Sequence, residues 1–225
     1  MKNAYLCQQF IDIHTHDLNA CGHTRILNLD AAKPLIGSTE YEYCSVGIHP
    51  WTLNGENSAE ALERLKAMAH QPKVLAIGEC GLDRLAATPW VLQEEALQQQ
   101  IDLAILLGKP MIIHCVRAHN ELIRIARAKK LALPLIIHGF DSSLAIAKQM
   151  LDYGFYLGFG KALLNPKSNA AKVILECPTD RVFVETDDSD YPIEAYYAKA
   201  CELLQLGMDD FSAIIAQNFT RVFRL

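Results

Sequence analysis

The sequence predicts an α/β fold, a (β/α)8 TIM-like barrel, from three observations. Eight short apolar segments recur along the 225 residues, longer amphipathic segments separate the later ones, and several are apolar without interruption. Strands that helices bury on both faces have such continuous apolar sequences. Strands that alternate with helices form right-handed βαβ units and a parallel sheet, and eight such units close into a barrel.

The predicted strands are Phe10–His14, Arg25–Leu29, Tyr43–Ile48, Val74–Glu79, Met111–Cys115, Leu135–His138, Phe155–Gly158 and Val182–Thr186. The predicted helices are Ala59–His70, Trp90–Leu107, Ala118–Lys130, Ser143–Tyr153, Pro166–Glu176, Ile193–Leu206 and Asp209–Phe223. Ser58 is the expected N-cap of the first helix, because its hydroxyl can accept a backbone N–H of the first turn. The segment between His16 and Gly47 is too short for full outer helices, so we expect it to be loop-rich or to carry one short helix. Nothing in the sequence indicates a linker, so we expect one domain over residues 1–225.

The composition indicates a globular chain outside the membrane. Hydrophobic residues make up 51% and charged residues 21%, which suits a sizeable core and excludes a disordered chain. No apolar segment approaches the ~18 residues of a membrane span, and the N-terminus lacks the apolar segment of a signal peptide. Seven cysteines are scattered without a C-x-x-C pair, as in proteins that keep their thiols reduced, so we expect a cytoplasmic location. The net charge of −5 excludes a general basic surface for nucleic acid, although bound divalent ions would concentrate positive charge in one cleft.

Metal-ligand residue types recur where the predicted strands end. His14 and His16 point the same way, because strand residues alternate faces, and two such imidazoles can chelate one divalent ion. The complete set is His14, His16, Glu79, His114, His138 and Asp187. The carboxyl ends of the strands carry the active site in barrels of this class, and histidine and carboxylate are ligands that zinc and manganese prefer. The sequence therefore predicts one or two divalent ions (Zn, Mn or Mg), with Glu79 able to bridge two of them.

The same residues predict hydrolysis by a metal-activated water. A water held between two cations loses its proton easily, and Asp187 could accept that proton and return it to the leaving group. His49 could contact a phosphate or donate a proton to the leaving oxygen; alternatively it is a structural histidine in the turn that Pro50 sets. Trp51 could stack on a base or pack on a loop. Asp187, Glu79 and His49 are thus the catalytic candidates.

Several segments resemble those of the TatD-type metal-dependent hydrolases (TatD DNase-like), a branch of the amidohydrolase superfamily. The matching segments are Asp12–His16, Gly47–Pro50, Ile77–Asp83, Ile113–His114, His138–Phe140 and Glu185–Asp187, together with the helical stretches Gln93–Pro110 and Asn218–Phe223. The resemblance implies a (β/α) barrel with one or two divalent metals, whose ligands fall on the six residues above. It also implies hydrolysis of phosphodiester bonds, often removal of nucleotides from DNA ends, and a cytoplasmic location.

The chain departs from that family around the ligands. Asp17 stands where the family usually has Leu, Arg117 lies three rather than two residues past His114, and Ala118 replaces an Asp. After Asp187 the chain continues with Asp188 and Ser189, where the family has Ala-Pro. The ligand types are retained and the substrate loops differ, so these departures bear on the substrate.

Two reactions suit this chemistry, because phosphoester and amide hydrolysis both need an activated water and a polarised oxygen. A phosphodiester needs further cations, and Arg84, Arg117 and Lys161 each follow a predicted strand. The favoured function is a phosphodiesterase or deoxyribonuclease, an exonuclease, acting on nucleic acid or another phosphodiester without a stable protein partner. The alternative is an amidohydrolase or lactonase acting on a small molecule. A catalytically inactive barrel kept as a binding module would have lost ligands, and none is lost.

Overall fold

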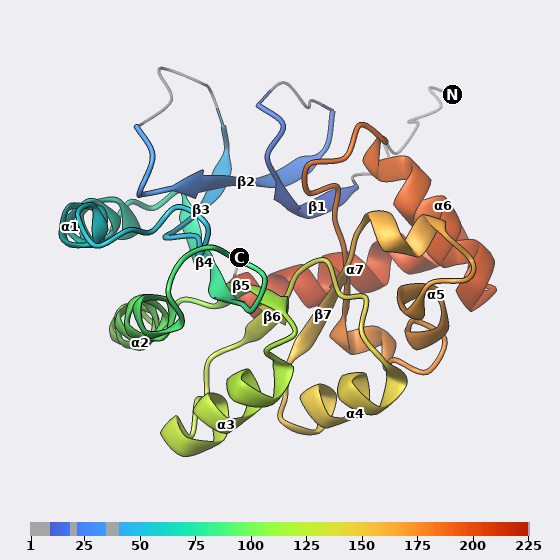
Figure 1. The fold of residues 1–225 in the computed structure, drawn as a ribbon. Helices are drawn as coiled ribbons and strands as arrows, with labels where there is room; N and C mark the ends of the chain where they lie inside the picture. The colour runs from blue at the N-terminus through green and yellow to red at the C-terminus, as the bar shows by residue number, and fades with distance from the viewer. Residues whose placement is uncertain (1–9, 19–21, 35–40, 225) are drawn as a thin grey trace.

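The computed structural model describes residues 10–18, 22–34 and 41–224, which form a parallel sheet with its strands in chain order. The strands are β1 Ile11–Thr15, β2 Thr24–Asp30, β3 Tyr43–Gly47, β4 Val74–Asp83, β5 Met111–Val116, β6 Leu135–Ile137, β7 Tyr156–Phe159 and β8 Val182–Val184. The ring closes just beyond β8, where the Asp187 N–H donates to the His14 carbonyl and the His16 N–H to the Asp187 carbonyl, both at 2.9 Å. The predicted (β/α)8-type barrel is therefore confirmed, and Figure 1 looks into it.

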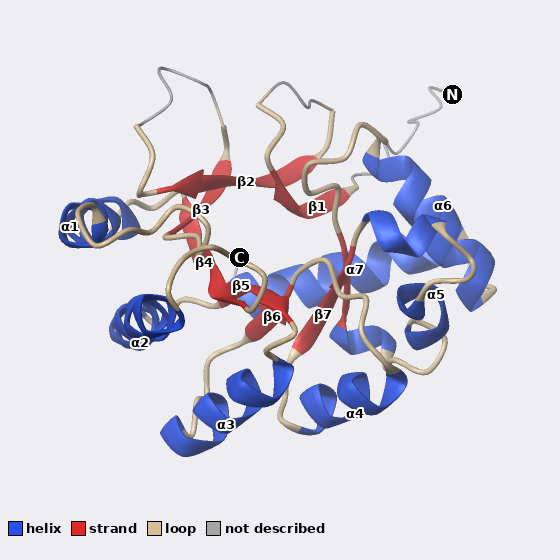
Figure 2. Cartoon of the chain, in the orientation of Figure 1, coloured by secondary structure: helices blue, strands red, loops and turns tan. Residues whose placement is uncertain are grey.

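Helices lie outside the strands on the left, below, on the right and behind them in Figure 2. They are α1 Ser58–Ala69, α2 Trp90–Leu107, α3 His119–Lys129, α4 Leu144–Asp152, α5 Asn169–Val173, α6 Ile193–Leu204 and α7 Met208–Phe223, with 3-10 turns η1 Lys161–Leu164 and η2 Thr179–Arg181. No helix among the described residues is long and apolar enough to cross a membrane.

Two predicted helix starts are wrong. Ser58 is not the N-cap of α1 but its first helical residue, and Asn57 occupies the cap position. The helix expected from Pro166 begins only at Asn169, because the Ser168 side chain accepts the Ala171 N–H at 3.0 Å and caps it there. Helix α5 ends at Val173, three residues before the predicted end.

The first strands are joined without outer helices. Between β1 and β3 the described residues contain β2 and connecting segments, and no helix. The prediction of a loop-rich segment is confirmed for these residues; residues 19–21 and 35–40 lie outside the described part.

Helix α7 lies behind the ring of strands in Figure 1 and covers their starts. The Phe219 ring lies 6.5 Å from the ring of Tyr43, which begins β3, and the Asn218 side-chain amide donates to the carbonyl of Val182, which begins β8, at 2.9 Å. The opposite end, where the strands finish, carries the predicted metal ligands.

Strand β4 runs four residues beyond its predicted end at Glu79. Its pairing with β5 shifts register between Ile77 and Cys80. Gly81 has φ +151°, and a Cβ there would overlap the carbonyl oxygen of His114. A glycine is thus required for β5 to approach this closely, and the extension brings Asp83 onto the same strand as Glu79.

Candidate metal centre

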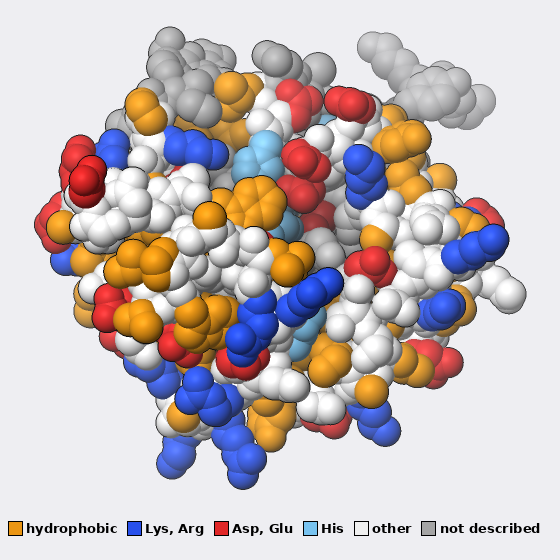
Figure 3. Space-filling view, in the orientation of Figure 1, with side chains coloured by type: hydrophobic (Ala, Val, Ile, Leu, Met, Phe, Trp, Pro, Cys, Tyr) orange, Lys and Arg blue, Asp and Glu red, His pale blue; other side chains and the backbone are white. Residues whose placement is uncertain are grey.

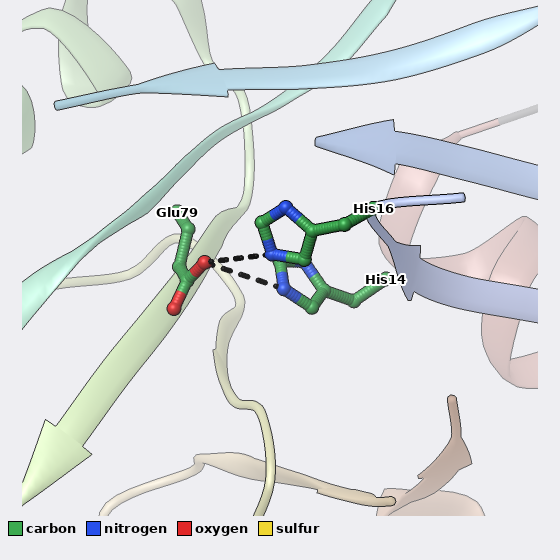
Figure 4. Close-up of side chains that lie close together, drawn as sticks. All are labelled: His14, His16 and Glu79. Atoms are coloured by element: carbon green, nitrogen blue, oxygen red, sulfur yellow. Dashed lines mark ion pairs between the residues drawn. The ribbon is translucent and has the colours of Figure 1, made fainter. Parts of the chain in front are cut away.

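Glu79 lies at the centre of a group of histidines at the carboxyl end of the barrel. Its side chain is 4% exposed. One carboxylate oxygen, Oε1, lies 3.0 Å from His49 Nε2, 3.0 Å from His114 Nδ1 and 2.7 Å from His138 Nε2. The other, Oε2, lies 3.4 Å from the Nε2 atoms of both His14 and His16, as Figure 4 shows.

Asp187 completes the set from the segment after β8. Its Oδ1 lies 3.4 Å from the Nε2 atoms of both His14 and His16. The structure therefore brings all six predicted ligand residues together. Three groups among them and His49 have ligand atoms within 4.8 Å of one another, namely His14–His16–Glu79, His14–His138–Asp187 and His49–Glu79–His114.

His14 fits a metal ligand by its lack of other partners. Its side chain is fully buried, its Nε2 meets the carboxylate oxygens of Glu79 and Asp187 only at 3.4 Å, and its Nδ1 has no hydrogen-bond partner within the described part of the chain. A buried polar atom without a partner costs free energy. A divalent cation between His14, Glu79 and Asp187 would give Nε2 a close partner, so these donors fit a bound metal.

Two histidines have carboxylates behind them. His114 Nε2 lies 3.1 Å from Asp83 Oδ2, and His138 Nδ1 lies 3.5 Å from Glu185 Oε1. A carboxylate favours the proton on the ring nitrogen beside it, so each of these rings, when neutral, would leave the lone pair of its other nitrogen for a metal. This arrangement is typical of histidines that bind metals.

Glu185 reaches this position through space that a glycine leaves open. The carboxylate is 0% exposed, and its Oε1 also accepts the Gly139 N–H. A Cβ on Gly158 would overlap Glu185 Oε2. The small residue on β7 thus lets a buried carboxylate sit behind His138.

His49 is oriented in the opposite sense. Its Nδ1 accepts the backbone N–H of Trp51 at 3.1 Å. That nitrogen is therefore an acceptor, and the proton of the neutral ring sits on Nε2, which faces Glu79 Oε1. His49 thus presents an N–H to the centre, whereas the carboxylates behind His114 and His138 favour a lone pair there when those rings are neutral.

Asn28 on β2 holds Glu79 in place, and the sequence reasoning did not single it out. Its Oδ1 accepts the Glu79 backbone N–H at 2.7 Å and the Ser45 hydroxyl at 3.1 Å. Its Nδ2 donates to Glu79 Oε2 at 3.4 Å. The one signal in the sequence is an asparagine inside an apolar strand, a position where that residue is disfavoured.

Electrostatics keep the centre charged in the absence of metal. Burial raises the pKa of Glu79, but the charge of His138 and hydrogen bonds from the surrounding histidines outweigh it and hold the pKa well below 4.5. Burial and His138 lower the pKa of His14, yet the carboxylates of Asp187 and Glu79 raise it to about 9. Without a metal, positive charge on His14 and His138 therefore balances the charge of the buried carboxylates.

The predicted substrate-binding cations lie away from this centre. Arg84 pairs with Glu121, donates to the Arg117 carbonyl at 3.0 Å and lies over the Trp90 ring at 4.4 Å. Arg117 and Lys161 are exposed. None of the three predicted cations lines the two cavities of the site, so their substrate role stays a prediction.

Two cavities meet at the centre, where Figure 3 shows a hollow with His, Asp and Glu side chains. One of about 730 Å³ is lined by Glu79 and its histidines together with Trp51, Leu18, Leu29, Pro34 and Lys33. The other, of about 670 Å³, is lined by Asp187 and further acidic residues, among them Asp188 and Asp190.

Comparisons with known proteins agree with this geometry. The family model described as TatD related DNase matches residues 11–224. The uncharacterized metal-dependent hydrolase YjjV of Escherichia coli is 28% identical over 200 residues, which cover 81% of this chain and 77% of YjjV. The 3'-5' ssDNA/RNA exonuclease TatD of Cronobacter turicensis is 35% identical over 150 residues, 64% of this chain and 56% of that protein.

The fold is also shared with solved structures. The crystal structure of YjjV superposes with a TM-score of 0.83 at 24% identity and covers 97% of this chain and 99% of its own. A hydrolase of the TatD family from Entamoeba histolytica superposes with a TM-score of 0.76 at 16% identity, over 96% of this chain and 98% of its own. The chain belongs to the TatD related DNase family.

Proposed function

We propose that the chain is a metal-dependent phosphodiesterase, a deoxyribonuclease that removes nucleotides from an end of single-stranded DNA. The observation that carries the proposal is the orientation of the histidines around Glu79. Carboxylates lie behind His114 and His138, so that each ring, when neutral, leaves a lone pair for a metal, whereas His49 accepts a backbone N–H and directs its own N–H at the centre. Family membership and relatives named 3'-5' ssDNA/RNA exonucleases support nucleic acid as the substrate.

The residues that would hold one or two divalent ions are His14, His16, Glu79, His114, His138 and Asp187. Such ions supply positive charge that lowers the pKa of a water nucleophile and stabilises phosphoryl oxygens. That charge is needed here, because Lys33 is the one Lys or Arg among the described residues that line the cavity beside Glu79, and it lies 3.8 Å from Asp30. We leave the choice among Zn, Mn and Mg to measurement.

Asp187 and His49 divide the proton transfers between them. Hydrogen bonding to His14 outweighs burial and lowers the pKa of Asp187, so this carboxylate is ionised and can accept a proton from water at Oδ1. His49 carries its proton on Nε2 and can donate it to the leaving oxygen or to a phosphoryl oxygen. Glu79 orients the surrounding groups through both carboxylate oxygens.

We also propose that the enzyme works in the cytoplasm without a stable protein partner, as one domain. The described cysteines are Cys44, Cys80, Cys115, Cys177 and Cys201, and all are free thiols, which suits a reducing compartment. The candidate ligands and proton donors all come from this one chain, so no second protein is needed to complete the site.

The test offers single-stranded DNA to protein loaded with Zn, Mn or Mg. Oligonucleotides labelled at the 5′ or the 3′ end distinguish removal of terminal nucleotides from internal cleavage and give the direction. We expect release of mononucleotides, abolished by His14→Ala. His70→Ala is the matched control, because His70 is exposed at the end of α1, and it should cut DNA at the wild-type rate.

A panel of amides and lactones tests the alternative, a small-molecule amidohydrolase or lactonase. DNA that stays intact with all three metals contradicts the nuclease proposal. Cleavage that survives His14→Ala points to a contaminating nuclease and contradicts it equally.

A further inference from the structure

Trp51 is exposed yet held in a fixed orientation. Its side chain is 65% exposed, although tryptophan is usually largely buried. The indole Nε1 donates to Asp83 Oδ2 at 2.6 Å, and the backbone N–H donates to His49 Nδ1 at 3.1 Å. Most of the ring surface faces solvent while its polar edge is tethered, so the ring offers a rigid apolar surface.

This surface stands beside the metal centre. The Trp51 ring centroid lies 4.9 Å from that of His49 and 5.4 Å from that of His114, both in edge-on contact. Trp51 lines the cavity of about 730 Å³ that also contains Glu79. Leu18, Leu29 and Pro34 line the same cavity, so part of its wall is apolar.

We propose that Trp51 stacks on the base of the nucleotide whose phosphodiester bond lies at the metal centre, an inference that rests on the proposed nuclease function. An aromatic ring stacks on any of the four bases, because every base has a flat π face. An apolar wall suits a base and not a phosphate, and the tethers at Asp83 and His49 fix the distance from the stacked base to the reacting groups. Trp51 is thus a substrate-binding residue that tolerates any sequence.

The experiment compares two substrates that differ only in the terminal base. One oligonucleotide ends in a normal nucleotide, and the other ends in an abasic nucleotide at the end the enzyme degrades. Each is cut by wild type, Trp51→Leu and Trp51→Phe, and metal content is measured for every variant. Tyr153→Leu is the control, because Tyr153 is an exposed aromatic at the end of α4.

In the wild type we expect a KM about 5- to 150-fold lower for the substrate with the base, the range that stacking one base on an aromatic ring provides. Trp51→Leu should reduce this ratio to near one, whereas Trp51→Phe keeps a stacking face and should keep most of it. Tyr153→Leu should show the wild-type ratio. If Trp51 only holds Asp83 in place, Trp51→Leu should lose activity equally on both substrates and should also lose metal, and that result overturns the proposal. An unchanged KM ratio in Trp51→Leu overturns it as well.

Tryptophan fluorescence detects stacking on Trp51 without requiring any cleavage of the substrate. The chain has two tryptophans, so Trp90→Phe leaves Trp51 as the one emitter. Thymidine monophosphate should quench this emission saturably, and ribose phosphate, which has no base, should not. If no oligonucleotide is cut, the nuclease proposal fails, and this titration still decides the stacking proposal: absent or base-independent quenching overturns it.

Discussion

Removing the Asn28 side chain should loosen Glu79 at the centre of the site. In Asn28→Ala the buried Glu79 N–H loses its acceptor at 2.7 Å, and Oε2 loses the amide donor at 3.4 Å. An unsatisfied buried donor costs about 1–3 kcal/mol. A central value of about 2 kcal/mol corresponds to a fall in Tm of about 4–8 °C for a chain of this size.

The metal affinity should fall together with the stability. Groups that orient a metal ligand typically contribute about 10–100-fold in affinity, and Asn28 contacts Glu79 at both its backbone and its carboxylate. Titration calorimetry with Zn or Mn measures the affinity, and thermal unfolding of the metal-free protein measures the stability.

Ser45→Ala is the matched control for Asn28→Ala. Its hydroxyl donates to the same Asn28 Oδ1 at 3.1 Å, and the structure gives it no hydrogen bond to Glu79. It should lose about 0.5–1.5 kcal/mol with little change in metal affinity. An Asn28→Ala protein that binds metal as tightly as the wild type would refute the reasoning, because Glu79 would then be oriented without Asn28.

Two further predictions concern pH and packing. The pKa of His14 in the metal-free protein is raised from 6.5 to about 9, so the stability it contributes is complete below pH 6.5 and is lost as pH rises through 9. The Tm of the metal-free protein should therefore fall over that pH range. Metal binding at pH 7 should release protons, which is measured as a dependence of the binding enthalpy on the buffer. An absence of proton release would contradict the raised pKa of His14. Gly158→Ala should cost about 1–3 kcal/mol in chemical denaturation, because the methyl group overlaps the buried Glu185 carboxylate and displaces it from the Gly139 N–H. The control is Gly55→Ala, where a Cβ meets no atom within 4 Å. Equal losses of stability in both variants would show that the space left by Gly158 is not needed for Glu185.

The strands were predictable because burial on both faces leaves a continuous apolar signal, and most ends moved by only one or two residues. Strand β4 is the exception. The predicted end is Glu79, and a glycine such as Gly81 inside a strand usually weakens or interrupts it. In the structure the same glycine lets β5 approach, so the strand continues to Asp83. The extension of β4 depends on its packing against β5, which the sequence of one segment does not reveal.

The six candidate ligands could be grouped from sequence, because the carboxyl ends of parallel strands meet at one end of a barrel. The residues that orient these ligands could not be identified from the sequence. Asn28 contacts Glu79 from β2 although β2 pairs with β3, so the contact depends on the curvature of the closed sheet. Arg84 shows the converse, since a cation after a strand suggested phosphate binding and the structure pairs it with Glu121 on α3.

The site also shows why residue type alone does not assign a role. His49, His114 and His138 all place a nitrogen within 3.0 Å of the same Glu79 oxygen. What differs is the group behind each ring: carboxylates behind His114 and His138, and a backbone N–H behind His49. A carboxylate favours the ring proton on the nitrogen beside it, which leaves the other nitrogen of a neutral ring free for a metal, whereas a backbone donor leaves the proton facing the centre. In the proposed mechanism, three identical side chains around one carboxylate thus divide into two ligands and one proton donor, and Asp83, Glu185 and the turn at Trp51 would make that division.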